Sequence, residues 1–337
     1  MSIPASLDLL DDLLSRARRA GADAADAVLV QGAALTVAER LGRPEKLERA
    51  EGRDLGLRVF VGKRQAIVSS TDFSPRALDE LAGRAVAMAK AVPEDPFCGL
   101  AEVDEIARSA PELDLCDPEE PATETLIARV REAEAAARAV PGVTNSEGAE
   151  AGWSRSLVAL AASNGFRNGY AVSHSAISAS VIAGEGTAME RDYDFSSAVY
   201  AAELEPAERI GRRAGEKAVK RLNPRKVATA KVPIVFDPRV ANSLIGHLAG
   251  AINGASIARG ISFLKDKLGE RIFPAGTDIV DDPHRRRGLR SRPFDGEGLP
   301  NARRLLVEDG VLKTWVLDLR SARQLGLKST GNASRGT

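Results

Sequence analysis

Residues 231–254 read KVPIVFDPRVANSLIGHLAGAING, a short apolar run that leads directly into a helical pattern. Lys231–Phe236 predicts a strand, and Asp237-Pro238 pairs an N-cap acid with a helix-starting proline. We expect a buried helix that ends near Asn253-Gly254. Its only histidine is His247, and it has no cysteine and no carboxylate beyond Asp237. Since a catalytic metal centre needs about three protein ligands, the helix by itself predicts a scaffold.

The region after this helix alternates between strand patterns and turn residues. Strands are predicted at Thr277–Val280, Arg303–Glu308 and Val311–Leu317, and Asp309-Gly310 is a strong hairpin signal. Residues 227–337 therefore predict a β-rich C-terminal domain with an embedded helix. The chain stops at Thr337 without an element typical of a domain end, so we expect this domain to be incomplete; the sequence does not explain the stop.

The N-terminal two thirds predict two helix–antiparallel-sheet units, which makes the fold class α+β. Residues 1–95 form the first unit and residues 122–226 the second, and the Pro- and acid-rich residues 96–121 are a linker. In the first unit we expect helices over Ser6–Ala20 and Ser74–Val92, two short strands joined across Gly32, and a hairpin turning at Gly62-Lys63-Arg64. The short strands are placed at Asp26–Gln31 and Ala34–Glu39.

Composition excludes several classes of function. Lys plus Arg and Asp plus Glu both number 47, so no net charge favours nucleic acid or anionic lipid. Aromatic residues make up 4%, and the two cysteines are too few for a disulfide scaffold. No apolar run reaches the roughly 18–20 residues of a membrane span, and no secretory signal is recognisable. We expect a cytoplasmic protein that does not bind membranes.

The histidines and one basic run are the remaining candidates for chemistry. His174 lies in an alternating strand pattern and His247 in the apolar helix, so both are expected to be structural. The segment Asp281-Asp282-Pro283-His284 favours a polar turn whose acids pair with nearby arginines. His284–Arg292 (HRRRGLRSR) is the strongest basic cluster, and a single such loop in a neutral chain is typical of a solvated face or an acidic-partner contact.

Several short blocks, in order along the chain, resemble the TldD/PmbA family, known as modulators of DNA gyrase and as cytosolic peptide-processing metallopeptidases. The blocks are Gly52–Val59, Ser163–Phe166, Gly254-Ala255-Ser256, Arg259–Phe263, Leu268-Gly269-Glu270, Pro293–Gly298, Leu305–Leu312 and Thr330–Ala333. The resemblance covers essentially the whole chain.

In this family the TldD-type subunit carries H-E-x-x-x-H on the helix quoted above, with zinc-binding histidines and a glutamate general base. The resemblance places Ile245, Gly246 and Gly250 at those three positions, and His247 is out of register. The chain thus resembles the PmbA (TldE) type, a subunit without its own catalytic or metal-binding residues. His247, Asn253, Arg259 and Gly260 are then candidate peptide- or cleft-lining residues.

What the resemblance implies is a non-catalytic subunit of a two-subunit zinc metallopeptidase. A TldD-type partner would hold the zinc, and unfolded or leader peptides would enter in extended form and pair along a strand edge. The chain itself would need no cofactor, and a homodimer is possible in the partner's absence. Two alternatives stay open: a regulatory protein that contacts gyrase or nucleic acid through the basic run, and an independent metal-dependent hydrolase built on the three histidines.

Overall fold

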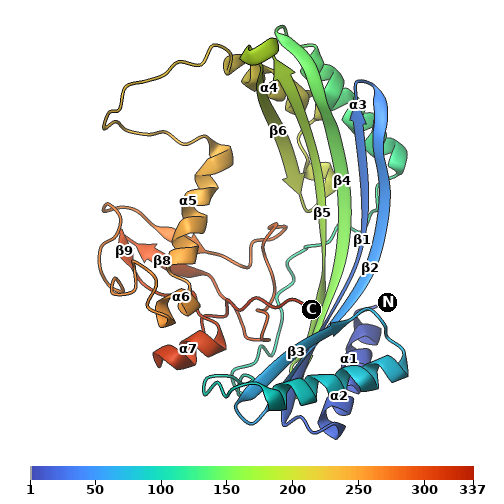
Figure 1. The fold of residues 1–337 in the computed structure, drawn as a ribbon, viewed down its shortest axis with the longest axis vertical. Coiled ribbons are helices and arrows are strands. Elements are labelled where there is room, and N and C mark those ends of the chain that lie inside the picture. The colour runs from blue at the N-terminus through green and yellow to red at the C-terminus, as the bar shows by residue number, and fades with distance from the viewer. Residues whose placement is uncertain (1) are drawn as a thin grey trace.

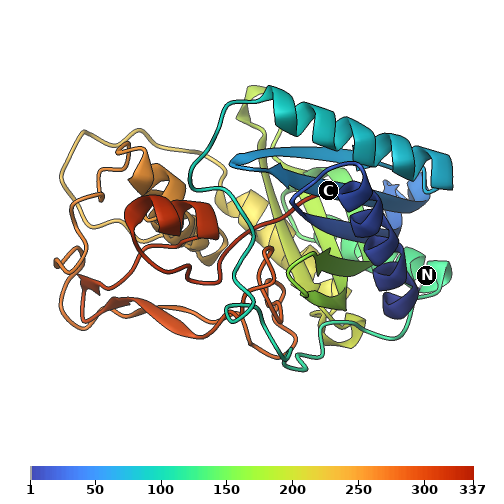
Figure 2. The same cartoon turned by 90° about the horizontal axis from the view of Figure 1, so that it is seen from below.

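The computed structural model describes residues 2–337 and is organised around one long, curved, antiparallel sheet (Figure 1). The strand order is β3-β2-β1-β4-β5-β6. The strands are β1 (Ala24–Arg40), β2 (Arg43–Val61), β3 (Arg64–Ser70), β4 (Val143–Ala162), β5 (Arg167–Ala183) and β6 (Glu190–Ala198). Helices cover one face of the sheet and the C-terminal unit lies on the other side (Figure 2). The predicted α+β class is confirmed.

Two helix pairs bury opposite ends of the same sheet face. Helices α1 (Ile3–Arg19) and α2 (Pro75–Ala91) cover the first end, where Leu10 and Leu13 of α1 belong to the same buried core as Leu57 of β2. Helices α3 (Thr123–Arg138) and α4 (Ala207–Lys220) cover the other end. Because side chains alternate along a strand, residues 25, 27 and 29 of β1 point into the first core and residues 35 and 37 into the second.

The strands of the two N-terminal units join into a single ladder at β1 and β4. The prediction of two short strands interrupted at Gly32 is wrong, because Gly32 lies opposite Gly52 on one side and Ser156 on the other. Pairing on both sides keeps the chain extended through a glycine that would weaken an isolated strand. The hairpin between β2 and β3 and the helix capped by Ser74 are as predicted.

The C-terminal unit contains a small sheet, three α-helices and its own core. Its strands are β7 (Ile279–Asp281), β8 (Arg304–Glu308) and β9 (Val311–Leu312), and its helices are α5 (Pro238–Ala251), α6 (Gly254–Ala258) and α7 (Leu319–Leu325). The turn between β8 and β9 is at Asp309-Gly310 as predicted, and both residues adopt the left-handed φ that a two-residue hairpin requires.

Two expectations for residues 231–254 are wrong. Lys231–Phe236 is extended but belongs to no strand, and Ile234 and Val235 are 72% and 95% exposed. Within residues 2–337 no strand pairs with this segment, and an apolar run becomes a strand only when its backbone groups find partners. Helix α5 forms as predicted, but Leu248 is its only buried residue. It is therefore not a buried helix.

Buried charges connect the C-terminal unit to the sheet. Asp26 of β1 pairs with Arg58 of β2, and Arg335 Nη2 lies 2.8 Å from Asp26 Oδ1. Glu297 Oε1 lies 3.7 Å from Arg58 Nη1 in the same cluster. All four side chains are largely buried, so breaking one pair would leave an uncompensated charge in the interior. The cluster fixes the far side of the sheet against residues 295–335.

Residues 96–121, predicted to be a linker, contain no helix or strand but are packed against both parts of the molecule. Arg323 of α7 donates to the carbonyl oxygens of Phe97, Gly99 and Leu100. The segment then crosses the sheet, where Leu115 is buried and accepts a hydrogen bond from the Ser173 amide. No helix within residues 2–337 is long and apolar enough to cross a membrane.

Candidate functional site

Helix α5 stands apart from the large sheet and lies opposite its edge strand β6 (Figure 1). Asp237 caps the helix by accepting a hydrogen bond from the Arg239 amide at 2.9 Å. The Arg239 guanidinium reaches back to β6, where Nη1 donates to Asp192 Oδ1 and to the Tyr193 carbonyl oxygen, both at 2.7 Å. This residue therefore ties the start of the helix to the edge strand of the large sheet.

The three positions singled out on α5 lie on its open surface. Ile245 is 48% exposed, and a Cβ atom added at Gly246 or Gly250 would meet no heavy atom within 4 Å. Larger side chains would fit here, yet isoleucine and glycine offer no metal donor. The fit of zinc to these three positions is therefore poor, because none of them carries an imidazole, thiolate or carboxylate, and His247 alone is too few ligands for a metal centre.

The histidines are distributed over three separate elements. His174 is exposed on β5 and His247 is exposed on α5. His284 precedes the basic loop, where its Nε2 lies 2.6 Å from Asn301 Oδ1. Nowhere in the described part of the chain do three His, Cys, Asp or Glu residues gather as a metal site would require. The structure gives no support to a metal centre built on the three histidines.

The other candidate cleft residues lie at the end of α5 and around α6. Asn253 caps α6 through its side chain. Close packing requires glycine at position 254, because a Cβ atom there would lie 2.4 Å from Ser321 Oγ. Arg259 is exposed, and Gly260 has a left-handed φ of +69°. These placements explain why glycine is needed at 254, and the roles of Asn253, Arg259 and Gly260 in a cleft stay predictions.

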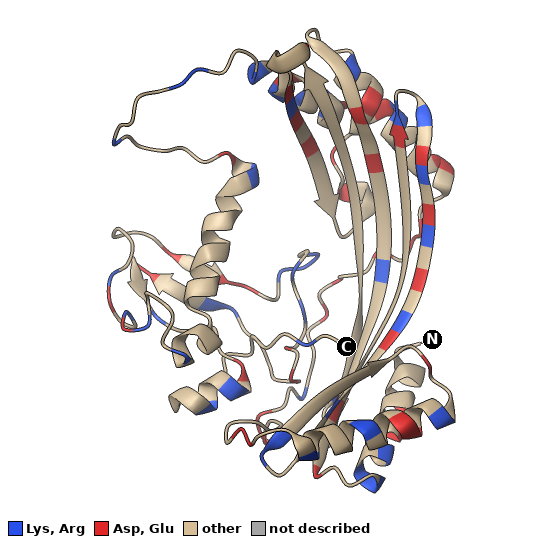
Figure 3. Cartoon of the chain, in the orientation of Figure 1, with Lys and Arg blue, Asp and Glu red and all other residues tan. Residues whose placement is uncertain are grey.

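A cavity of about 950 Å³ lies where the end of β6 meets the C-terminal unit. Its wall includes Ser197 and Ala198 of β6, the loop after β7 and the residues just before β8. Five arginines line it: Arg285, Arg287, Arg290, Arg292 and Arg303. Figure 3 shows basic segments of this loop in the space between the C-terminal unit and the sheet. We call this cavity the arginine cavity.

Ion pairs fix one side of the arginine cavity. Arg287 stacks over the Tyr200 ring at 3.8 Å and donates to Asp114 and Glu203, each at 2.6 Å. Hydrogen bonds from the Tyr200 hydroxyl and, with smaller effects, from Arg287 and Arg286 lower the pKa of Asp114 to about 2. The prediction that the loop's arginines pair with Asp281 and Asp282 is wrong. Arg286 and Arg287 pair instead with Asp114, and Arg287 also with Glu203. These partners are far away in the sequence, so no local pattern predicted them.

The guanidinium groups of Arg285, Arg290 and Arg303 make no ion pair or hydrogen bond with any residue in the described range 2–337. All three are exposed. The sequence identified the first two as part of a basic run but gave no sign of Arg303, which lies beside them only because β8 folds back along β7. The cavity thus presents unneutralised donors suited to carboxylates or phosphates.

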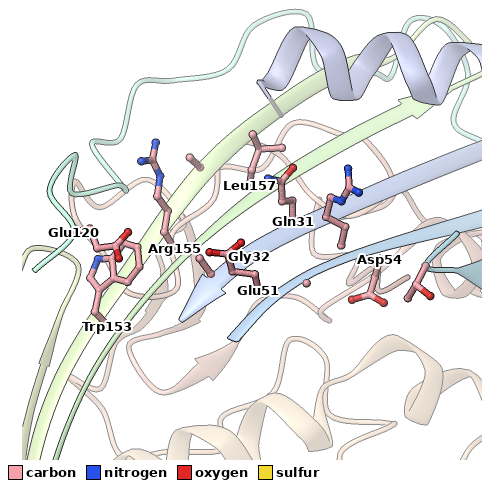
Figure 4. A pocket seen from close by; sticks show the side chains of 13 residues that line it. Gln31, Gly32, Glu51, Asp54, Glu120, Trp153, Arg155 and Leu157 are labelled. Carbon is pink, nitrogen blue, oxygen red and sulfur yellow. The ribbon is translucent and has the colours of Figure 1, made fainter. Parts of the chain in front are cut away.

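A second cavity, of about 960 Å³, lies on the helix-covered face of the sheet, and Figure 4 shows the side chains that line it. Gln31, Trp153, Arg155 and Glu120 line it, and Trp153 Nε1 is buried without a hydrogen-bond partner among the described residues. Three acidic residues and two arginines line this cavity, so it has no excess of positive charge, and the sheet separates it from α5. The arginine cavity is therefore the better candidate site.

Comparison with protein families gives three matches that together span most of the chain. Residues 25–89 match the PmbA/TldA metallopeptidase domain 1, residues 116–222 the PmbA/TldA metallopeptidase central domain, and residues 229–337 the PmbA/TldA metallopeptidase C-terminal domain.

Among individual proteins, the metalloprotease PmbA of Escherichia coli O157:H7 is 37% identical over 92% of this chain and 69% of its own length. The PmbA homolog of Haemophilus influenzae is 35% identical over 94% of this chain and 70% of its own length.

Solved structures show the same fold. A putative modulator of DNA gyrase from Bacteroides thetaiotaomicron superposes with a TM-score of 0.92 at 24% identity, over 97% of this chain and 75% of the other. TldE from Thermococcus kodakarensis superposes with a TM-score of 0.81 at 21% identity, over 97% and 74%.

Proposed function

This chain belongs to the PmbA/TldD metallopeptidase family, and from that premise we propose that it is a non-catalytic, PmbA (TldE)-type subunit of a two-subunit zinc peptidase. A TldD-type partner would bind the zinc and activate water. One observation carries the proposal: Ile245, Gly246 and Gly250 occupy the open face of α5 and supply no metal donor.

The substrate side of the proposal concerns the free edge of β6. Among residues 2–337 this strand pairs with β5 alone, so its other edge has no strand partner, and that edge lies on the side of α5 (Figure 1). An extended peptide that added to this edge would be held by main-chain hydrogen bonds, which favours unfolded or leader peptides over folded proteins. Arg239 already occupies the Tyr193 carbonyl, so we expect the peptide to use the remaining length of the strand.

The gyrase or nucleic-acid alternative depends on the basic run. Two of its arginines, Arg286 and Arg287, are engaged by Asp114, and the chain has no net charge to attract DNA. The alternative would return if the chain bound duplex DNA in a salt-sensitive way that weakened on replacing Arg285, Arg286 and Arg287 by alanine. We favour the peptidase subunit.

The test is to purify the chain alone and together with a TldD-type partner from the same cell. We expect the pair to cleave an unstructured fluorogenic peptide, chelation to stop the reaction, and all of the zinc to reside in the partner subunit. The chain alone should be inactive. Chelator-sensitive cleavage by the chain alone at a rate comparable to the pair, or stoichiometric zinc in it, would contradict the proposal.

A further inference from the structure

We propose that the arginine cavity is a carboxylate-recognition subsite that selects acidic segments of the bound peptide. This inference rests on the peptide-binding part of the proposed function and adds a chemical preference to it. A main-chain contact along a strand edge is indifferent to sequence, so any preference must come from side-chain pockets beside that edge.

The position of the cavity connects it to the edge strand. The last two residues of β6 are Ser197 and Ala198, and both also form part of the cavity wall. A peptide lying along the free edge of β6 would therefore pass into the cavity at the end of the strand. Its side chains would meet the loop after β7, which carries Arg285 and Arg290.

The charge of the cavity decides which side chains would bind. Arg285, Arg290 and Arg303 are free, whereas Arg287 is neutralised by Asp114 and Glu203. Free guanidinium groups bind carboxylates bidentately, and because these three arginines are exposed, each contact weakens as the salt concentration rises. The stacking of Arg287 on Tyr200 holds the loop in place. The three free arginines are not needed for this contact and stay available to a ligand.

Peptide carboxylates suit the cavity better than nucleic acid does. Asp281, Asp282 and Glu203 also line the wall, and they would repel the closely spaced phosphates of a nucleic acid strand. The nearby aromatic ring, Tyr200, is covered by Arg287 and is not available to stack on a base. A peptide can place isolated acidic side chains at the arginines and uncharged residues near the acids.

Binding of labelled peptides to the full chain tests the inference. The probes are a fluorescent Ser/Thr/Val peptide with glutamates spaced between uncharged residues and its glutamine counterpart, each with a free and an amidated C-terminus. We expect the glutamate peptide to bind about tenfold more tightly in fluorescence anisotropy, less so at high salt. The comparison of free and amidated ends separates side-chain from C-terminal carboxylates.

Matched variants assign the preference to the cavity. Replacing Arg285, Arg290 and Arg303 together by alanine should abolish the difference between the two peptides, because the variant lacks the proposed carboxylate donors. The fold should be retained, because these arginines have no structural partner to lose. Replacing three exposed arginines outside the cavity that make no ion pair within residues 2–337 (Arg19 of α1, Arg43 of β2 and Arg84 of α2) removes the same charge and should leave the difference intact. Thermal unfolding of both triple variants verifies that they are folded.

Three outcomes would overturn the inference. Equal binding of both peptides would remove the subsite and leave the proposed subunit role standing. No binding of either peptide would remove the subsite too, and cleavage by the assembled pair would then judge the proposed function separately. An oligothymidine that bound more tightly than the glutamate peptide, with the same dependence on the three arginines, would assign the cavity to nucleic acid.

Discussion

Glu297 is buried where the C-terminal unit meets the sheet. Its Oε2 accepts a hydrogen bond from the Leu319 amide at 2.9 Å, and its Oε1 lies 3.7 Å from Arg58 Nη1. Burial raises the pKa of this carboxyl to about 7, and the Leu319 amide and Arg58 only partly counter the effect. Asp295 and Asp318 add to the rise. The folded chain therefore retains a proton that the unfolded chain loses near pH 4.5.

The sign of the pH dependence follows from this difference. Because the folded state binds the proton more tightly, the stabilisation is complete below about pH 4.5 and is lost as the pH rises through about 7. We expect the free energy of unfolding to fall by up to about 3 kcal/mol over this interval. Chemical denaturation of Glu297→Gln across the same range should give a flatter curve.

Glu308→Gln serves as the control, since Glu308 is half exposed and pairs with Lys313 at the surface. This variant should keep the slope of the unchanged protein. If Glu297→Gln and the unchanged protein showed the same slope between pH 4.5 and pH 7, the raised pKa of Glu297 would be contradicted.

At the scale of elements, small residues set the distance between α3 and α4. A Cβ atom at Gly211 of α4 would lie 1.9 Å from the Ala133 carbonyl oxygen of α3, so the helices touch through their backbones. Nothing in the local sequence of α4 reveals this need, because glycine in a helix interior is ordinarily a cost. The partner helix is 70 residues or more away in the chain, and only packing identifies it.

Gly211→Ala should lower the free energy of unfolding by about 1–3 kcal/mol, since the helices must separate to admit the methyl group. Gly83→Ala provides the matched control: Gly83 lies inside α2, and its added Cβ would meet nothing within 4 Å. That change should be neutral or stabilise the chain by up to about 1 kcal/mol. Equal losses in urea unfolding would show that the close contact is absent.

At the scale of the whole molecule, residues 96–121 connect the sheet, the helices and the C-terminal unit. Arg323 Nη2 donates to the Leu100 carbonyl at 2.6 Å and Nη1 to the Gly99 carbonyl at 3.0 Å. These contacts join α7 to a segment more than 200 residues earlier. Both carbonyl groups would lose their partner without the guanidinium.

Arg323→Ala should therefore expose residues 97–100 to proteolysis at least several times faster than in the unchanged protein. Arg320, on the same helix, pairs with Asp95 at the surface, so Arg320→Ala should have a much smaller effect. Limited proteolysis followed by mass spectrometry of the fragments measures both. Equal rates for the two variants would argue against a structural role for the Arg323 contacts.

Local patterns predicted much of this molecule. Ser74-Pro75 begins α2, Asp237-Pro238 begins α5, and Asp309-Gly310 turns the β8–β9 hairpin, because caps, fixed proline φ and left-handed turn residues act within a few positions. The absence of metal donors at Ile245, Gly246 and Gly250 is also a property of residue types alone. The sequence therefore determined the class of the fold, the family resemblance and the composition of α5.

Tertiary structure decided what depends on distant partners. Gly32 lies within one continuous strand because β2 and β4 pair with it, whereas the more apolar Lys231–Phe236 has no pairing strand in the described chain and stays extended and exposed. Arg303 joins Arg285 and Arg290 because β8 folds back on β7. Backbone pairing and charge convergence are set by contacts between residues far apart in sequence, which no local pattern records.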